Sequence, residues 1–134
     1  MVTLQDLGRC TFPALLRHSL EKFSQRPALS LVHGEPITYG QFQQMMDRVA
    51  RVMTANGFAP RKKVAILGPG MSQWGAVYLA TVCRGGIAVP LLPDFTTEEL
   101  RNILGHASVD MLVVSRSLYP KVQDLGEDLL PVII

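Results

Sequence analysis

Three polar residues near the end of the chain could bind a phosphate group. Ser115, Arg116 and Lys121 follow the apolar run from Met111 to Val114, which has the pattern of a buried strand in a parallel sheet. Parallel sheets bind ligands at the carboxyl ends of their strands, where a hydroxyl and two cations would suit phosphate. Two cations alone hold phosphate weakly, so a solvated surface is the simpler interpretation of the same residues.

A glycine-containing turn is the second place where the sequence could bind phosphate. Gly68-Pro69-Gly70 lies between an apolar run, Val64 to Leu67, and a helix expected from Gln73. Such turns bring backbone N–H groups and a helix N-terminus to a dinucleotide pyrophosphate. The dinucleotide fingerprint needs a third glycine where Gln73 stands, and Gly75 comes two positions late. We therefore interpret the segment as a tight turn between buried elements.

Spacing reveals no catalytic or metal-binding cluster. His18, His33 and His106 lack a cysteine or carboxylate partner nearby in the sequence, so structural roles are expected for all three. Cys10 and Cys83 are far apart, which predicts neither a disulfide framework nor a metal site and favours the cytoplasm. The Gly-Lys-Ser/Thr of phosphate loops and the Gly-x-Ser-x-Gly of hydrolases are both absent.

Composition limits the possible partners. The 134 residues suit one domain, and 13 Lys and Arg against 11 Asp and Glu give a net charge of +2 without clustering, so nucleic acid is not an expected partner. The stretch from Val64 to Cys83 carries no charge, but Gly68-Pro69-Gly70 would leave backbone groups unsatisfied in a bilayer, which argues against a transmembrane segment. The sequence stops inside the apolar run Leu129 to Ile134, so we expect a fragment of a longer protein.

The elements that would position these residues are organised around a central unit of strand, helix and strand. Val64 to Leu67 is the first strand, and Ser72 is expected to cap a buried helix over 73–84. Gly85-Gly86 would end that helix with left-handed backbone, and Ile87 to Val89 is the second strand.

Two helices are expected before this unit. Thr11 would cap a helix over Phe12 to Ser24. Thr38 with Gln41 would form a capping box for a second helix, which Asn56-Gly57 ends. The second helix has the cleanest apolar stripe in the chain, which is typical of an amphipathic helix.

The last third of the chain predicts two more helices and two more strands. Thr96 with Glu99 forms a second capping box, and Met111 to Val114 is a buried-type strand. A short helix is expected over Leu118 to Leu125, and Val132 to Ile134 would begin a final strand.

A hairpin completes the predicted architecture. Gly34-Glu35 predicts a two-residue type II′ turn that joins strands over 28–33 and 36–38. The other strands alternate with helices, which is typical of an α/β domain. The predicted fold class is therefore three-layer α/β, with a mostly parallel sheet, helices on both faces and an N-terminal antiparallel hairpin.

The order of these segments resembles the beginning of the AMP-forming acyl-CoA synthetase and adenylation superfamily. The match covers nearly the whole chain from Phe12 onward, and a series of short stretches carries it. They are Ile37-Thr38-Tyr39; Lys63-Val64-Ala65-Ile66-Leu67 followed by Trp74; Tyr78-Leu79-Ala80; Gly85-Gly86-Ile87-Ala88-Val89-Pro90-Leu91; Glu99-Leu100 with Ile103-Leu104; and Val113-Val114. The chain departs from the family at Arg61-Lys62-Lys63, where Gly-Asp is common, and at Gly70 or Met71, where Asn is frequent.

The resemblance implies a parent enzyme that activates a carboxylic acid, with long-chain fatty or aryl acids expected. Such an enzyme uses ATP and Mg to form an acyl-adenylate and transfers the acyl group to CoA. Residues 1–134 would be the N-terminal scaffold subdomain of its large lobe, with the remainder of its own chain as partner. The family's catalytic motifs come later, so no catalytic residue is assigned, and the fragment alone is expected to be inactive. In some members, basic residues after the corresponding strand approach the CoA phosphates, which implies Arg116 and Lys121 as CoA contacts.

Three other functions fit the same residues. An adenylation domain of a peptide synthetase, or of another superfamily member, would use the same fold with a different acyl acceptor. A flavodoxin-like binding module without catalysis would share the layered sheet. An interaction scaffold could expose the methionine-rich helix that contains Met45, Met46 and Met53, although core filling is the simpler interpretation of these residues.

Overall fold

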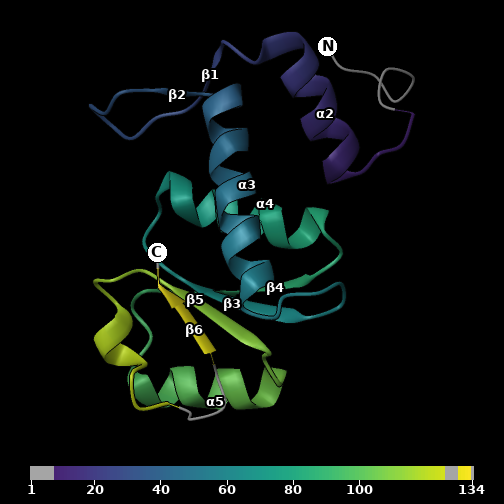
Figure 1. The fold of residues 1–134 in the computed structure, drawn as a ribbon. Coiled ribbons are helices and arrows are strands. Elements are labelled where there is room, and N and C mark those ends of the chain that lie inside the picture. Colours follow the sequence, from purple (N-terminus) through teal and green to yellow (C-terminus); the bar gives the residue numbers. More distant parts are fainter. Residues whose placement is uncertain (1–7, 126–129, 134) are drawn as a thin grey trace.

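Helices and strands alternate along most of the chain. The computed structural model describes residues 8–125 and 130–133. Its elements are α2 (Phe12–Phe23), β1 (Pro27–Leu29), β2 (Ile37–Thr38), α3 (Tyr39–Ala55), β3 (Lys63–Leu67), α4 (Ser72–Cys83), β4 (Ile87–Leu91), α5 (Thr97–Ala107), β5 (Met111–Val114), the 3₁₀ helix η1 (Tyr119–Lys121) and β6 (Leu130–Ile133). Figure 1 shows α3 and α4 on one side of the main sheet and α5 on the other, with α2 and the hairpin beyond α3.

Four parallel strands form the main sheet, in the order β4-β3-β5-β6. Ala65 of β3 lies opposite Val89 of β4 on one side and Leu112 of β5 on the other. The strand predicted near the end of the chain is β6, which begins at Leu130 rather than Val132. The predicted strands of the central unit and of the last third therefore lie in one sheet.

Alternate residues of the central strands enter two separate cores. Ile66 is 2% exposed and belongs to a cluster with Met53 of α3, whereas Leu67 is 1% exposed and clusters with Leu100 of α5. Burying one such aliphatic side chain stabilises the fold by roughly 1.5–3 kcal/mol. Because both faces are covered, the strands need no polar alternation. The predicted three-layer α/β class is confirmed, together with its antiparallel hairpin.

Side-chain caps begin three of the helices as predicted. The Thr38 hydroxyl accepts from Gln41 N at 3.2 Å, and Gln41 Oε1 accepts from Thr38 N at 2.8 Å. Thr96 and Glu99 make the same reciprocal pair at the start of α5, with distances of 3.3 and 2.7 Å. Thr11 caps α2 through its side chain. Each cap contributes about 1 kcal/mol, so local sequence suffices to set these helix starts.

The helix α4 begins differently from the prediction. Ser72 is its first residue, and the cap position is Met71, whose side chain makes no capping hydrogen bond. Trp74 N and Gly75 N donate to the Met71 carbonyl at 3.1 and 3.4 Å, so the helix starts one residue early. The Ser72 hydroxyl donates instead to Gln73 Oε1 at 3.1 Å. The predicted Ser72 cap is therefore wrong, although every residue of α4 is buried or half-buried, as expected.

The strands β1 and β2 form the predicted ribbon, but the predicted turn is wrong. Residues 30–36 lie outside the ladder, so the connection is longer than two residues. The chain reverses where Gly34 N donates to Leu31 O at 2.9 Å, and the left-handed residue is His33, at φ 61°. The Ser30 hydroxyl, 2.8 Å from Leu31 O and 3.1 Å from Gly34 O, stabilises this wider loop.

The helix predicted over 118–125 is also wrong. Only Tyr119–Lys121 forms a helical element, and it is a single 3₁₀ turn. Val122 N donates to Tyr119 O at 2.9 Å and Leu125 N to Val122 O at 3.1 Å, which is the three-residue spacing of 3₁₀ and turn structure. Burial of Val122 in the α5 core holds this segment against the sheet.

The edge strand β4 continues past its predicted end at Val89 to Leu91. Ile87 N donates to Lys62 O at 2.9 Å, and in a parallel strand every second residue faces the same neighbour. Pro90 therefore falls on the free edge, where its missing N–H costs no ladder bond.

Among the described helices, none combines the length and apolar character that crossing a membrane requires.

Candidate functional site

The turn that follows β5 lies at the carboxyl end of the sheet and has Arg116 at its tip. Ser115 N donates to Leu67 O at 2.9 Å, which extends the contact between β3 and β5 by one bond. Leu118 N then donates to Ser115 O at 3.0 Å and reverses the chain. The hydroxyls of Ser115 and Ser117 lie 3.2 Å apart and share a hydrogen bond. Arg116 lies between these two serines, at the tip of the turn.

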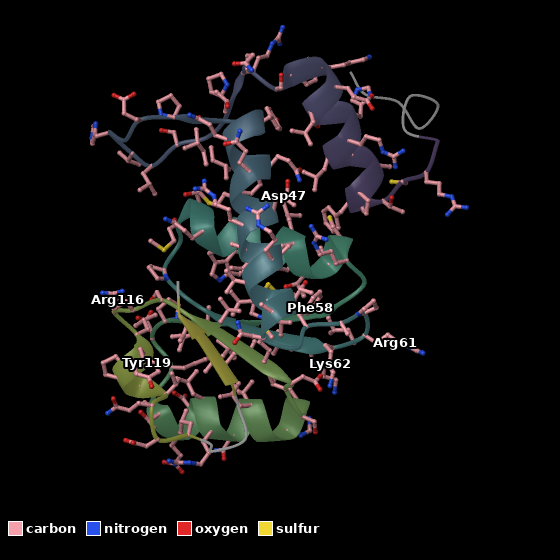
Figure 2. All side chains as sticks on the ribbon, in the orientation of Figure 1. Asp47, Phe58, Arg61, Lys62, Arg116 and Tyr119 are labelled. Atoms are coloured by element: carbon pink, nitrogen blue, oxygen red, sulfur yellow. The ribbon has the colours of Figure 1, made fainter. Side chains whose placement is uncertain are left out.

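Arg116 is exposed. Figure 2 shows it beyond the end of β5, pointing away from the ribbon. Within the described residues, no hydrogen bond or ion pair engages its guanidinium. A free guanidinium is suited to bidentate phosphate binding.

Lys121 has a different environment. Its ammonium donates to Pro93 O at 2.6 Å and to Phe95 O at 3.1 Å, and the side chain is partly buried. Its own carbonyl accepts from the Thr97 hydroxyl at 3.1 Å. Two of its three ammonium protons are therefore engaged, and the third has no acceptor among the described residues.

The structure brings both predicted cations to the carboxyl end, and it adds groups that sequence reasoning missed. Pro93 and Phe95 supply carbonyls, and Thr97 supplies a hydroxyl. All three lie in or just after the connection from β4 to α5. The strands β4 and β5 flank β3, so the segments that follow them meet at the carboxyl end of the sheet. A sequence signal for this meeting would require the strand order, which hydrophobic patterns do not contain.

The Gly68-Pro69-Gly70 turn has no feature of a phosphate cradle. Neither glycine adopts left-handed backbone. A Cβ on Gly70 would meet nothing within 4 Å, and one on Gly68 would lie 3.6 Å from Trp74 Cδ1, an ordinary contact. Glycine is thus not required for close approach at either position, which agrees with the interpretation as a tight turn.

A groove of about 390 Å³ separates the hairpin loop from the start of α4. Leu31, Met71 and Trp74 contribute to its lining. Trp74 also stacks on Tyr78, with ring centroids 5.5 Å apart and planes 9° apart, and packs against the α3–α4 core. A second hollow, of about 20 Å³ beside Ser115, has room for roughly one water molecule. The aromatic pair therefore serves packing, and Trp74 also lines the groove.

Two carboxylates have lowered pKa values for structural reasons. The pKa of Glu99 is lowered by the backbone N–H of Thr96 and then by its hydroxyl. The pKa of Asp110 is lowered chiefly by the hydrogen bond from Lys62, with the Lys63 backbone N–H next. Both acids stay ionised at neutral pH, which suits a cap and an ion pair. In residues 8–125 and 130–133, no three His, Cys, Asp or Glu side chains are grouped to hold a metal ion.

Cys83 has the opposite shift. Burial raises the pKa of its thiol, and the nearby Arg84 opposes that effect only in part. The thiol is therefore protonated at neutral pH and is a poor nucleophile. The histidines lie apart in the fold: His18 is buried on α2, His33 is exposed in the hairpin loop, and His106 is exposed on α5.

The chain belongs to the AMP-binding enzyme family, whose model matches residues 16–133. Long-chain-fatty-acid–CoA ligase ACSBG2 of Mus musculus is 29% identical over 107 residues, which cover 78% of this chain and 16% of the relative. Surfactin synthase subunit 2 of Bacillus subtilis (strain 168) is 25% identical over 103 residues, 77% of this chain and 3% of that protein. The chain thus spans about a sixth of the mouse relative's length.

Solved structures of the family share the fold. The crystal structure of the anthranilate CoA ligase AuaEII in complex with anthranoyl-AMP matches with a TM-score of 0.82 and 20% identity, over 92% of this chain and 24% of that one. The N-terminal domain of FACL13 from Mycobacterium tuberculosis matches with a TM-score of 0.82 and 20% identity, over 92% and 33%. This similarity confirms the α/β architecture, and the family match over residues 16–133 confirms the resemblance inferred from the sequence.

Proposed function

We propose that residues 1–134 form the truncated N-terminal scaffold subdomain of the large lobe of an AMP-forming acyl-CoA ligase. The supporting observation is the family match over residues 16–133, in a chain that spans only 16% of its mouse relative. Its partner would be the remainder of the same polypeptide, which would pack on this sheet and contain the reacting groups.

The proposed reaction has two steps. A carboxylate oxygen of the acid attacks the α-phosphorus of Mg-bound ATP, which gives an acyl-adenylate and releases pyrophosphate. The thiol of CoA then attacks the acyl carbon and releases AMP, leaving a thioester. We propose a long-chain fatty acid as the substrate, supported by the name of the mouse relative.

The described residues contain no catalytic group in this proposal. In this proposal the rest of the protein would hold the Mg and the ATP phosphates. Arg116 and Lys121 would contact the CoA phosphates, Arg116 through its guanidinium, which has no partner among the described residues, and Lys121 through the one ammonium proton that Pro93 and Phe95 leave available. We propose the cytoplasm as the location, because Cys10 and Cys83 are both free thiols.

Pyrophosphate release tests the scaffold role. The full-length protein, supplied with ATP, Mg and a C16 fatty acid, should release pyrophosphate and then form acyl-CoA and AMP when CoA is added. The 134-residue chain should release none under the same conditions. Pyrophosphate from the short chain would contradict the proposal, as would a full-length protein that leaves the acid unactivated.

Charge reversal tests the CoA contact. Arg116→Glu in the full-length protein should raise the KM for CoA about tenfold, because one charge-assisted phosphate contact is lost, and leave the KM for ATP unchanged. Arg61→Glu is the matched control, since Arg61 is also exposed but lies at the opposite end of the strands, just before β3 (Figure 2). Equal effects of the two changes would argue for general electrostatics rather than a site.

An adenylation domain of a peptide synthetase is a second candidate. The match to surfactin synthase subunit 2 supports it. The two candidates differ in the thiol that accepts the acyl group, which is free CoA in one and a carrier-protein phosphopantetheine in the other. Mass spectrometry of the acylated product, with both acceptors offered to the full-length protein, separates them.

A further inference from the structure

The segment that joins β4 to α5 has few hydrogen bonds of its own. Phe95 N donates to Leu92 O at 3.2 Å, and Pro93 has no N–H to give. Leu92 and Asp94 are exposed. A loop of this kind opens easily unless another part of the chain holds it.

Lys121 holds this loop in place through its side-chain ammonium and through its backbone carbonyl. Its ammonium lies 2.6 Å from Pro93 O and 3.1 Å from Phe95 O, and its carbonyl accepts from the Thr97 hydroxyl at 3.1 Å. Hydrogen bonds from a charged donor are about twice as strong as neutral ones, and partial burial strengthens them further. Without the ammonium, two half-buried carbonyls would lose their protein donor.

This contact links segments that follow two different strands of the sheet. The Lys121 side chain belongs to the segment after β5, and its carbonyl acceptors belong to the segment after β4. The strand β3 lies between β4 and β5. The ammonium therefore joins the connections that follow two non-adjacent strands, one on either side of β3.

We propose that Lys121 is a positioning residue, whose ammonium latches the 92–97 segment over the carboxyl end of β3. The part of this inference that concerns CoA rests on the proposed function: the latch would hold the 92–97 segment beside Arg116, so that loss of the latch weakens CoA binding without loss of chemistry. The latch itself depends only on the described contacts.

Hydrogen exchange in the full-length protein tests the latch directly. Lys121→Met keeps the apolar stem but removes the donors, so amides of residues 94–97 should exchange about tenfold faster while those of β3 and β5 are unchanged. Lys22→Met is the matched control, because Lys22 is exposed on α2 and far from this edge. Unchanged exchange at 94–97 in Lys121→Met overturns the proposal.

Chemical rescue distinguishes a latch from a general loss of structure. In Lys121→Ala, propylammonium can occupy the vacated space and donate to the two carbonyls, so it should restore slow exchange at 94–97. Tetramethylammonium has the same charge but no N–H, and should not restore it. Rescue by both cations, or by neither, would contradict an ammonium that acts as a hydrogen-bond donor.

Kinetics separate this inference from the proposed function. In an active full-length ligase, Lys121→Met should raise the KM for CoA, and propylammonium should lower the KM of Lys121→Ala. Arg116→Gln should raise the KM without altering exchange at 94–97. A protein that forms no acyl-CoA would refute the proposed function, while the exchange and rescue measurements would still decide the latch.

Discussion

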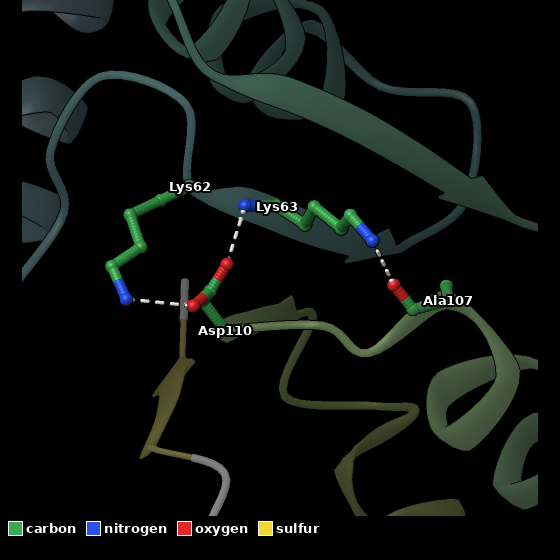
Figure 3. A network of polar contacts seen from close by, with 4 residues as sticks. All are labelled: Lys62, Lys63, Ala107 and Asp110. Carbon is green, nitrogen blue, oxygen red and sulfur yellow. Dashed lines mark hydrogen bonds and ion pairs between the residues drawn. The ribbon is translucent and has the colours of Figure 1, made fainter.

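The two ends of the parallel sheet both use lysines to join segments, but they join them differently. At the amino end, Lys62 Nζ lies 2.7 Å from Asp110 Oδ1, and Asp110 Oδ2 accepts from Lys63 N at 2.8 Å. Lys63 Nζ donates to Ala107 O at 2.6 Å, which satisfies a carbonyl at the end of α5 (Figure 3). These contacts tie the start of β3 to the start of β5 and the end of α5.

At the carboxyl end, the ammonium of a single lysine joins two connections, and a neighbouring guanidinium has no partner among the described residues. Lys121 donates to the carbonyls of Pro93 and Phe95, whereas the guanidinium of Arg116 has no partner among the described residues. The serine hydroxyls beside it bond each other. The proposed CoA contact would use this guanidinium.

We infer that this difference separates stability from ligand binding. Parallel strands that point the same way put all their carboxyl ends at one edge, where connections can be varied without disturbing the ladder. The amino end contains the close packing and the ion pair, so substitutions there should change the free energy of unfolding. Substitutions at the carboxyl end should change ligand affinity more than stability.

The largest expected effect is at Gly86, at the amino end of β4. A Cβ there would lie 2.7 Å from Phe58 Cε2 and 2.9 Å from Thr81 Cγ2, and both side chains are buried. Gly86→Val should lower the free energy of unfolding by about 3 kcal/mol through overpacking. Gly105→Ala, at an open position in α5, is the control and should be neutral or stabilising. Urea unfolding followed by circular dichroism measures both, and a neutral Gly86→Val would remove the contrast between the two ends.

The next largest effect is expected at Asp110. Asp110→Ala removes the acceptor for Lys62 Nζ and for Lys63 N, which should lower the free energy of unfolding by about 1.5 kcal/mol at pH 7. Asp110→Asn keeps one acceptor oxygen and should lose less. A change below about 0.3 kcal/mol for Asp110→Ala would show that the contact contributes nothing beyond solvent.

The same carboxylate predicts a pH dependence. The pKa of Asp110 in the folded chain is below its ordinary value of 3.8, so the folded state binds fewer protons than the unfolded state. Its stabilising effect is therefore complete above the ordinary pKa and is lost as the pH falls through the lowered one. The difference in unfolding free energy between wild type and Asp110→Ala should shrink between about pH 5 and pH 2. A constant difference over that range would contradict the ion pair as its source.

A smaller, stabilising effect is expected at Arg61. This residue precedes β3 with left-handed backbone, φ 72°, and its N–H donates to Gly85 O at 2.7 Å. Left-handed backbone disfavours residues with a Cβ, so Arg61→Gly should raise the free energy of unfolding by roughly 0.5–1 kcal/mol. Arg61→Ala removes the charge but keeps the strain, and should give no such gain. Equal gains from both changes would assign the effect to charge.

The smallest effect is expected at Ser72, near the carboxyl end of β3. Its hydroxyl does not cap α4, so Ser72→Ala should change the free energy of unfolding by less than about 0.5 kcal/mol. Thr96→Ala removes a true capping hydroxyl of α5 and should cost about 1 kcal/mol. Thermal unfolding of the two variants tests whether the geometry, rather than the residue type, identifies a cap.

Much of the fold was predictable because local rules and burial agreed along the chain. The capping boxes of Thr38 and Thr96 require only residues three apart, and the unbroken apolar run of β5 required a strand covered on both faces. The hairpin turn and the Ser72 cap were predicted wrongly because residue type alone does not set where a ladder stops or a helix starts. The position of the hairpin turn depends on the hydroxyl of Ser30, and the start of α4 depends on the carbonyl of Met71.

The candidate site was predictable only in part. The sequence indicated that Arg116 and Lys121 follow a buried strand, and the structure places them there. It could not indicate that Lys121 is engaged by Pro93 and Phe95 while Arg116 is not. That outcome depends on β4 and β5 flanking β3, and hydrophobic patterns do not contain strand order.

By itself, the amino-acid sequence determined the layered α/β class, the capped helices and the family, because each depends on side-chain types at fixed spacings. Only the tertiary structure decided which lysine joins which segments. The acceptors of Lys63 and Lys121 are backbone carbonyls, and every residue has one. A partner that all residues possess has no sequence signature, so folding alone selects it.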